Sequence, residues 1–130
     1  MRLLIVEDEP FIAMDLEMIA AARGHEVVGV AATLDEAVDQ QAQAQPEAAF
    51  VDINLLDGFT GVDVARRLAR EGVRVGFVTG NLEQVPEDFA GAAGAVDKPF
   101  SDDSIAELLR VLDPGSETTN GLRFVRRPRH

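Results

Sequence analysis

The sequence contains no cysteine, tryptophan or tyrosine and has a single lysine, Lys98. The absence of cysteine excludes disulfide bonds and zinc sites built on thiolates. No apolar stretch approaches the roughly 18 to 20 residues that a transmembrane helix requires, so we expect a cytoplasmic protein that does not enter a membrane. With 130 residues, of which 46% are hydrophobic, the chain has room for one folded domain with a continuous core.

Positive charge is scarce and gathers at one end of the chain. The 12 basic residues face 23 acidic ones, and four of the arginines lie in residues 114–130 beside one acid. This tail therefore carries a formal charge of about +3, and residues 1–113 carry about -14. Because phosphate contacts need a basic face, the acidic body argues against nucleic-acid binding. We interpret 114–130 as a flexible, solvated tail, or else as a segment whose residues 122–129 dock on the acidic body or on a partner.

Short apolar runs alternate with segments whose apolar residues recur every three or four positions. The partly β-branched runs predict strands, and the periodic segments predict helices. Strands are predicted at residues 2–6, 26–32, 48–52, 73–78 and 95–97, and helices at 10–23, 34–45, 61–71, 82–93 and 102–113. The fourth helix is the weakest prediction, because Pro86 and Gly91 interrupt it.

Local signals refine these elements. Ser101 is placed as the N-cap of the last helix. Asp57 precedes a glycine, which indicates turn chemistry and not a ligand role. Phe11, Phe50 and Phe77 are predicted to lie in the core.

Five strand–helix units joined by short connections predict a doubly wound α/β fold, with helices on both faces of a parallel sheet. If the strand order is 2-1-3-4-5, the first and third strands are neighbours at the topological switch point. Open α/β sheets place their chemistry outside the carboxyl ends of these strands. Functional residues are therefore expected at the strand ends.

Charged side chains stand at the ends of three predicted strands. Glu7 and Asp8 follow the first, Asp52 closes the third, and Lys98 follows the fifth. Three carboxylates in one cleft repel each other, so protons or a cation must offset their charge. An all-oxygen site suits a hard cation such as Mg²⁺ or Mn²⁺, and Lys98 adds one compact ammonium.

A carboxylate beside a divalent cation can attack phosphorus and form an aspartyl phosphate. Asp52 is the candidate nucleophile, and the metal and Lys98 would stabilise charge on the transferring oxygens. Thr79, at the end of the fourth strand, could donate its hydroxyl to a phosphoryl oxygen, with the Gly80 amide beside it. Neither histidine of the chain is placed to act as a base, so the set fits phosphoryl capture better than hydrolysis.

The ordered set Glu7-Asp8, Asp52, Thr79 and Lys98-Pro99-Phe100 resembles the receiver domain of two-component response regulators. The resemblance covers residues 1–113 and implies a flavodoxin-like, CheY-like (βα)5 fold. It also implies that Asp52 is the phospho-acceptor and that the phosphodonor is a sensor histidine kinase or a histidine phosphotransferase.

The same resemblance assigns roles around Asp52. It implies that Asp8 binds the metal directly, that Glu7 binds it through a water, and that the backbone carbonyl of Asn54 completes the metal site. Lys98 is expected to contact the phosphoryl group and to precede a cis peptide bond to the proline that follows it.

One position departs from the family pattern. Receivers usually carry an aromatic residue three positions before the lysine, and it turns inward when the threonine engages the phosphoryl group. Here that position is Ala95, so the aromatic half of the switch formed with Thr79 is absent. Together with the sequence from Phe77 to Gly80, this is similar to the FATGUY group of receivers, from which Val78 and Asn81 depart. That group implies a stand-alone alphaproteobacterial receiver in general stress signalling, with a kinase of the HWE or related HisKA_2 type.

We therefore interpret the chain as a single-domain, monomeric response regulator. It would signal through protein contacts or serve as a phosphate shuttle or sink, and would not be an enzyme beyond slow autophosphatase activity. One alternative is a receiver fragment of a longer regulator, with the tail as linker. The other is an aspartate-based, magnesium-dependent phosphatase of the haloacid dehalogenase type, although that family wants a second aspartate where this chain has Asn54.

Overall fold

The computed structural model describes residues 1–113, so the predictions for 114–130 lie outside the described residues. The strands are β1 (Arg2–Val6), β2 (Glu26–Ala31), β3 (Ala48–Val51), β4 (Arg74–Thr79) and β5 (Gly94–Asp97). The helices are α1 (Pro10–Ala22), α2 (Leu34–Ala44), α3 (Gly61–Arg70) and α4 (Asp102–Leu112), and two 3₁₀ turns, η1 (Leu82–Gln84) and η2 (Phe89–Gly91), separate β4 from β5. No helix within residues 1–113 has the length and apolar character needed to cross a membrane.

The strands form one parallel sheet in the order β2-β1-β3-β4-β5, which confirms the doubly wound, flavodoxin-like topology predicted from the sequence. The chain passes from β2 back across β1 to reach β3, so β1 and β3 are neighbours at the switch point. Val6 pairs with Val51 at their carboxyl ends. The residues that follow these two strands therefore start out side by side.

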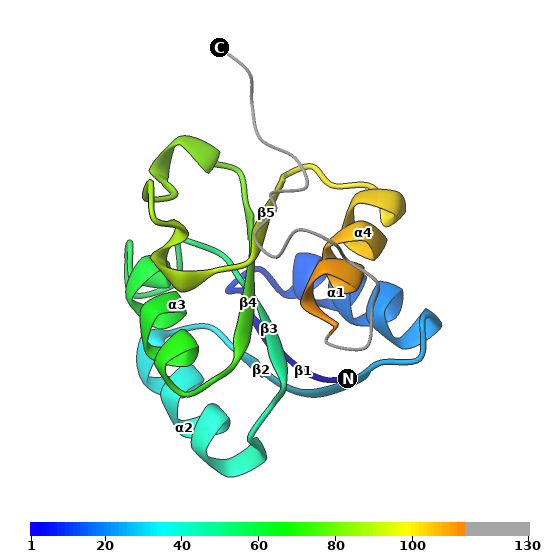
Figure 1. The fold of residues 1–130 in the computed structure, drawn as a ribbon, viewed down its shortest axis with the longest axis horizontal. Helices are drawn as coiled ribbons and strands as arrows, with labels where there is room; N and C mark the ends of the chain where they lie inside the picture. Colours follow the sequence, from blue (N-terminus) through cyan, green and yellow to red (C-terminus); the bar gives the residue numbers. More distant parts are fainter. Residues whose placement is uncertain (114–130) are drawn as a thin grey trace.

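Successive side chains along the central strands point to opposite faces of the sheet, and this divides the core into two layers. In β1, Leu3 and Ile5 belong to the layer beneath α1 and α4, whereas Leu4 and Val6 belong to the layer beneath α2 and α3. Figure 1 shows these two pairs of helices on opposite sides of the sheet. Because β1 is buried on both faces, the residues at its carboxyl end stand on a rigid platform.

The segment between β4 and β5 contains no α-helix, so the helix predicted at 82–93 is wrong, and the described residues contain four α-helices instead of five. Pro86 lacks an amide donor, and Phe89 adopts a left-handed backbone with φ of 58°. The segment is nevertheless anchored, because Leu82, Val85 and Phe89 are buried in the core layer beneath α2 and α3. The burial of these three apolar residues, and not a continuous helix, holds the segment in place.

Two of the three phenylalanines predicted for the core are buried, namely Phe50 and Phe77. Phe11 is instead 81% exposed, so its prediction was wrong. Helix α1 contacts the sheet through Ala13 and Leu16, and Phe11 lies on the other side of the helix. The sequence could not separate these sides, because α1 carries apolar residues on both.

Asp57 takes part in the turn after β3, as predicted, and it also contacts the start of α2, which was not predicted. Its Oδ1 accepts a hydrogen bond from Thr60 Oγ1 at 2.5 Å, and its Oδ2 accepts one from the Leu34 amide at 3.1 Å. This exposed carboxylate thereby ties the loop after β3 to the first residue of α2, and the bond from Thr60 lowers the pKa of Asp57. Ser101 also caps α4 as predicted, since its Oγ accepts from the Ser104 amide at 3.1 Å.

Helix α3 begins at Gly61, whose amide donates to the Ile53 carbonyl oxygen at 2.9 Å. The backbones approach so closely that a Cβ on residue 61 would lie 2.0 Å from the Asp52 carbonyl oxygen and 2.4 Å from the Ile53 Cα. Only glycine fits such an approach. The position of Asp52 at the end of β3 is therefore fixed partly by α3.

We expect Gly61→Ala to lower the free energy of unfolding by about 1–3 kcal/mol, because the added Cβ must displace the backbone around Asp52. Urea unfolding followed by far-ultraviolet circular dichroism measures this without a tryptophan. The matched control is Gly80→Ala, whose Cβ would meet only the Lys98 Cβ at 4.0 Å, and for which we expect a change below about 0.5 kcal/mol. Equal stability of Gly61→Ala and the wild type would contradict the close approach.

Candidate functional site

Three carboxylates meet at the carboxyl edge of β1 and β3. Glu7 and Asp8 directly follow β1, and Asp52 directly follows β3. The Asp52 amide donates to the Val6 carbonyl oxygen at 2.9 Å, so the hydrogen-bond ladder of the sheet continues up to the site. One oxygen from each carboxylate lies within 4.8 Å of the other two. The structure thus brings together the three acids that the sequence analysis assigned to one cleft.

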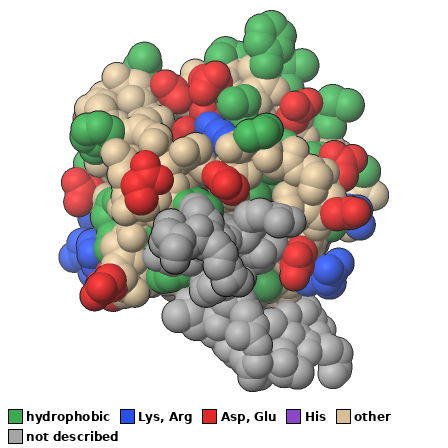
Figure 2. Space-filling view, turned by 90° about the horizontal axis from the view of Figure 1, so that it is seen from above, with side chains coloured by type: hydrophobic (Ala, Val, Ile, Leu, Met, Phe, Trp, Pro, Cys, Tyr) green, Lys and Arg blue, Asp and Glu red, His purple; other side chains and the backbone are tan. Residues whose placement is uncertain are grey.

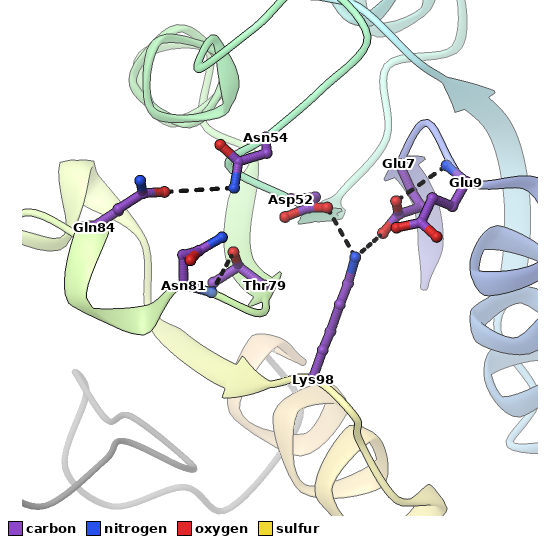
Figure 3. A network of polar contacts seen from close by, with 8 residues as sticks. All are labelled: Glu7, Glu9, Asp52, Asn54, Thr79, Asn81, Gln84 and Lys98. Carbon is purple, nitrogen blue, oxygen red and sulfur yellow. Dashed lines mark hydrogen bonds and ion pairs between the residues drawn. The ribbon is translucent and has the colours of Figure 1, made fainter.

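Lys98 reaches these carboxylates from the end of β5, on the other side of β4. Its Nζ lies 2.8 Å from Glu7 Oε1 and 2.8 Å from Asp52 Oδ2. Figure 3 draws both ion pairs as dashed lines. The Lys98 amide donates to the Thr79 carbonyl oxygen at 3.0 Å, which holds the lysine backbone beside the end of β4. The peptide bond from Lys98 to Pro99 is cis, as the family resemblance implied.

Burial controls the protonation of this cluster. Glu7 is only 3% exposed. Desolvation disfavours its charged form and, together with the Asp52 charge, outweighs the hydrogen bond from Lys98, so the pKa of Glu7 rises to about 7. Desolvation also opposes the charged form of Lys98, but the hydrogen bonds to Asp52 and Glu7 outweigh it and raise the pKa of Lys98. Near neutral pH the ammonium is therefore charged, while the Glu7 carboxyl exchanges its proton.

The donor set fits a hard divalent cation. Glu7, Asp8 and Asp52 offer only oxygen ligands, and the single ammonium of Lys98 cannot neutralise three ionised carboxylates. The pKa of Glu7 is raised chiefly by burial, and the negative charge of Asp52 adds to this effect. Because Mg²⁺ and Mn²⁺ prefer carboxylate oxygens, the cluster could hold either ion. The Asn54 backbone carbonyl as a further ligand stays a prediction.

Small and polar residues border the site at β4 and β5. Thr79 is fully buried at the end of β4, and its Oγ1 accepts a hydrogen bond from the Asn81 amide at 3.1 Å. Gly80 follows it, and its α-carbon faces open space except for the Lys98 side chain. Ala95, in β5, pairs with Phe77 of β4 and is also fully buried. At this position the core therefore holds a methyl group in place of an aromatic ring.

The sequence analysis missed one polar contact beside the site. The side-chain amide of Asn54 donates from Nδ2 to Gln84 Oε1 at 3.5 Å. Figure 3 shows Asn54, Asn81 and Gln84 on the side of Asp52 away from Glu7. Gln84 could not be predicted, because it lies in the segment whose helical prediction was wrong. The sequence offers only scattered polar residues after the end of β4, namely Asn81, Glu83 and Gln84.

The molecular surface agrees with this arrangement. Figure 2 looks down on the edge at which the strands end, and shows a basic side chain with acidic side chains close by near the middle of that face. Asp8 is the most exposed of the three site carboxylates, whereas Glu7 and Asp52 lie beneath the surface. The Asp8 carboxylate is therefore the part of the cluster that a cation from solvent can reach most directly.

Comparison with known proteins supplies a family context. Residues 3–110 match the family model described as the response regulator receiver domain. The phyllosphere-induced regulator PhyR of Methylorubrum extorquens is 36% identical over 111 residues, which cover 83% of this chain and 42% of PhyR. The transcriptional regulatory protein PdtaR of Mycobacterium tuberculosis is 32% identical over 117 residues, covering 86% of this chain and 55% of PdtaR. The chain thus spans about half the length of these curated relatives.

A solved structure of similar size agrees with the fold. The receiver domain of the PhyR response regulator from Erythrobacter litoralis, determined by NMR, is 30% identical and superimposes with a TM-score of 0.81. The match covers 92% of this chain and 94% of that domain. The sheet order and the helices on both faces are therefore those of a known class of domains.

The raised pKa of Glu7 predicts that the free energy of unfolding falls as pH rises from 4.5 to about 7, because folded Glu7 retains a proton that the unfolded chain has released. Glu7→Gln removes this titration. Relative to the wild type, the variant should gain about 1–3 kcal/mol of stability between pH 5 and pH 8. Urea unfolding at both pH values, without divalent cations, measures the change. A Glu7 pKa of 4.5 or below in a carbon-13 NMR titration would contradict the prediction.

Proposed function

The chain belongs to the response regulator receiver domain family, and from this we propose that Asp52 accepts a phosphoryl group from a histidine kinase or a histidine phosphotransferase. One observation carries the proposal. The buried Asp52 carboxylate has the Lys98 ammonium at 2.8 Å and two further carboxylates within 4.8 Å. A structural ion pair needs only one carboxylate, so the excess of acids favours a site that takes up a cation together with an anionic group.

In the proposed step, an Asp52 carboxylate oxygen forms a bond to phosphorus while the phosphorus–nitrogen bond of phosphohistidine breaks. The electron pair of the broken bond stays on the imidazole nitrogen. Lys98 already lies beside the Asp52 carboxylate, where its ammonium would balance charge on the transferring oxygens. Thr79 Oγ1 accepts from the Asn81 amide and keeps its own hydrogen available to a phosphoryl oxygen, with the Gly80 amide next to it.

A divalent cation completes the proposed site. Bound at Glu7, Asp8 and Asp52, Mg²⁺ or Mn²⁺ would offset the repulsion between these carboxylates and an incoming phosphate. We propose that Asp8 and Asp52 bind it directly, that Glu7 acts through a water, and that the Asn54 carbonyl oxygen adds a ligand. The greater exposure of Asp8 supports a direct role, because this carboxylate can reorient at low cost.

The proposed partners are proteins. Similarity to PhyR, which is described as a stress response regulator, supports a role in stress signalling. The proposed kinase of the HWE or HisKA_2 type follows from the resemblance to the FATGUY group. The chain would pass the signal on through protein contacts as a monomer, or drain phosphate as a shuttle or sink. The chain matches about half of PhyR and PdtaR, which supports a receiver within a longer regulator, and a stand-alone regulator is the other form that we propose.

We propose a phospho-acceptor and not a phosphatase. The residue two positions after Asp52 is Asn54, and its side-chain amide, which donates to Gln84, cannot act as a general acid or base. Without such a group, the departure of a small alcohol from a phosphoester has no proton donor at this position. One phosphoryl group per chain is therefore the expected yield.

Incubation with Mg²⁺ and acetyl phosphate should add one phosphoryl group to the wild-type chain, as seen by intact mass. Asp52→Ala should show no adduct, because the attacking oxygen is gone. Asp57→Ala is the matched control, since Asp57 is an exposed carboxylate outside the cluster, and we expect it to be labelled like the wild type.

Two outcomes would sink this proposal. One is equal labelling of Asp52→Ala and the wild type. The other is an unmodified wild type with both acetyl phosphate and a phosphorylated histidine phosphotransferase. Turnover of a small phosphoester well beyond one equivalent per chain would favour the phosphatase alternative instead.

Mg²⁺ should bind to the unphosphorylated chain and shift the NMR signals of residues around Asp52. We expect Asp8→Asn to weaken this binding at least about tenfold, because it removes one anionic ligand. Asp57→Asn serves as the control and should bind Mg²⁺ like the wild type. Unchanged affinity in Asp8→Asn would remove Asp8 from the metal site.

A further inference from the structure

Helix α1 carries an apolar stripe that the described residues leave uncovered. Phe11 is 81% exposed, Met18 67% and Met14 54%. Their spacing places them along one side of the helix, opposite Ala13 and Leu16 in the core. Single exposed apolar residues are ordinary, but a contiguous row of large ones marks a surface that another segment covers.

The stripe borders a groove between α1 and the start of α4. The groove has a volume of about 360 Å³, and Met18, Ile19, Ala22 and Phe100 form its apolar walls while Asp15 and Asp102 supply its charge. No basic side chain lines it among the described residues. We call the stripe and this groove together the α1 surface. Its chemistry fits a segment with apolar side chains flanked by arginines.

A second copy of the chain is a poor occupant. In a two-fold dimer the same patch meets itself. The acidic groups of the α1 surface would then face the same acidic groups of the partner, without a basic residue in the groove to pair with them. The ligand must instead bring positive charge.

Residues 122–129 of this chain have that composition. The segment reads Leu122, Arg123, Phe124, Val125, Arg126, Arg127, Pro128 and Arg129, and contains no acid. It therefore offers three large apolar side chains among four arginines. Four of the chain's basic residues thus lie together in a segment that follows a strongly acidic domain.

The length of the connection allows this segment to reach α1. Asp113, the last described residue, lines a hollow together with Arg23 and His25, just past the carboxyl end of α1. The residues 114–121 can span about 26 Å, and the distance along α1 from Ala22 to Phe11 is about 17 Å. Such a short tether gives an effective concentration in the millimolar range, which keeps even a weak contact occupied.

We propose that residues 122–129 bind the α1 surface, with Leu122 and Phe124 over its apolar part and the arginines against its carboxylates. Phe11 stands three residues after Asp8, so the bound segment lies beside the acidic cluster. The proposal does not rest on phosphorylation of Asp52.

The chain itself suggests the experiment. It has no cysteine, so Gly121→Cys accepts a single spin label next to Leu122, and Met14 and Met18 supply two of only three methionine methyl signals. In the full-length labelled protein, we expect the intensities of these two methyl signals to fall severalfold relative to the reduced, diamagnetic sample. High salt should restore them in part, since screening weakens the arginine contacts.

Two matched controls carry the same label. In one, Leu122→Ser and Phe124→Ser remove the apolar contacts, and in the other, Arg126→Glu and Arg127→Glu reverse the charge. Both should recover the methionine signals, while circular dichroism shows an unchanged fold. Undiminished signals in the first protein, or equal losses in all three, would overturn the proposal. So would a loss seen only when spin-labelled chains are mixed with isotope-labelled ones, because the contact would then join two copies.

Discussion

The Lys98 ammonium lies between the buried carboxylates of Glu7 and Asp52, and the arrangement of this sheet edge follows from that charge balance. Buried carboxylates at the ends of neighbouring strands repel each other and lose hydration. The order β2-β1-β3-β4-β5 puts the acids on two adjacent strands and the lysine two strands away from β3, at the reach of an extended lysine side chain. A shorter basic side chain at the end of β5 would leave both carboxylates unpaired. A lysine at the end of β4 would take the place of Thr79.

The positive charge at this site does not balance the charge of its carboxylates. One ammonium serves two carboxylates, and Asp8 adds a third. Burial, with the Asp52 charge adding to it, raises the pKa of Glu7 to about 7, so this carboxyl keeps its proton below that pH. A divalent cation at the same oxygens would release that proton and leave Lys98 able to turn toward an anionic group. Lys98 is present in every state of the cluster, so a proton on Glu7 and a divalent cation are the two alternatives for neutralising the charge that remains.

The strands and the acidic cluster could be predicted from the sequence, because both have local signals in it. Short apolar runs mark the strands, and a charged residue directly after a strand, such as Asp52 or Lys98, must lie at the sheet edge once the strands are parallel. The predictions failed where tertiary packing, and not the local sequence, determines the structure. Phe11 looked like core because α1 is apolar on both sides. The Gln84 contact depends on the irregular backbone of the segment between β4 and β5, which no periodicity encodes.

The segment between β4 and β5 and helix α1 lie on either side of the acidic cluster and differ in their backbone and in what they bury. Helix α1 is regular and presents large apolar side chains to its surroundings, whereas the segment after Thr79 buries Leu82 and Phe89 and has Gln84 in contact with Asn54. Because Ala95 is a methyl group in the core, no aromatic ring there can rotate to record a change at Thr79. A rearrangement at Thr79 would instead pass through the backbone that follows it. The 3₁₀ turns of this segment, which lack a continuous ladder of helical hydrogen bonds, yield more readily than an α-helix would.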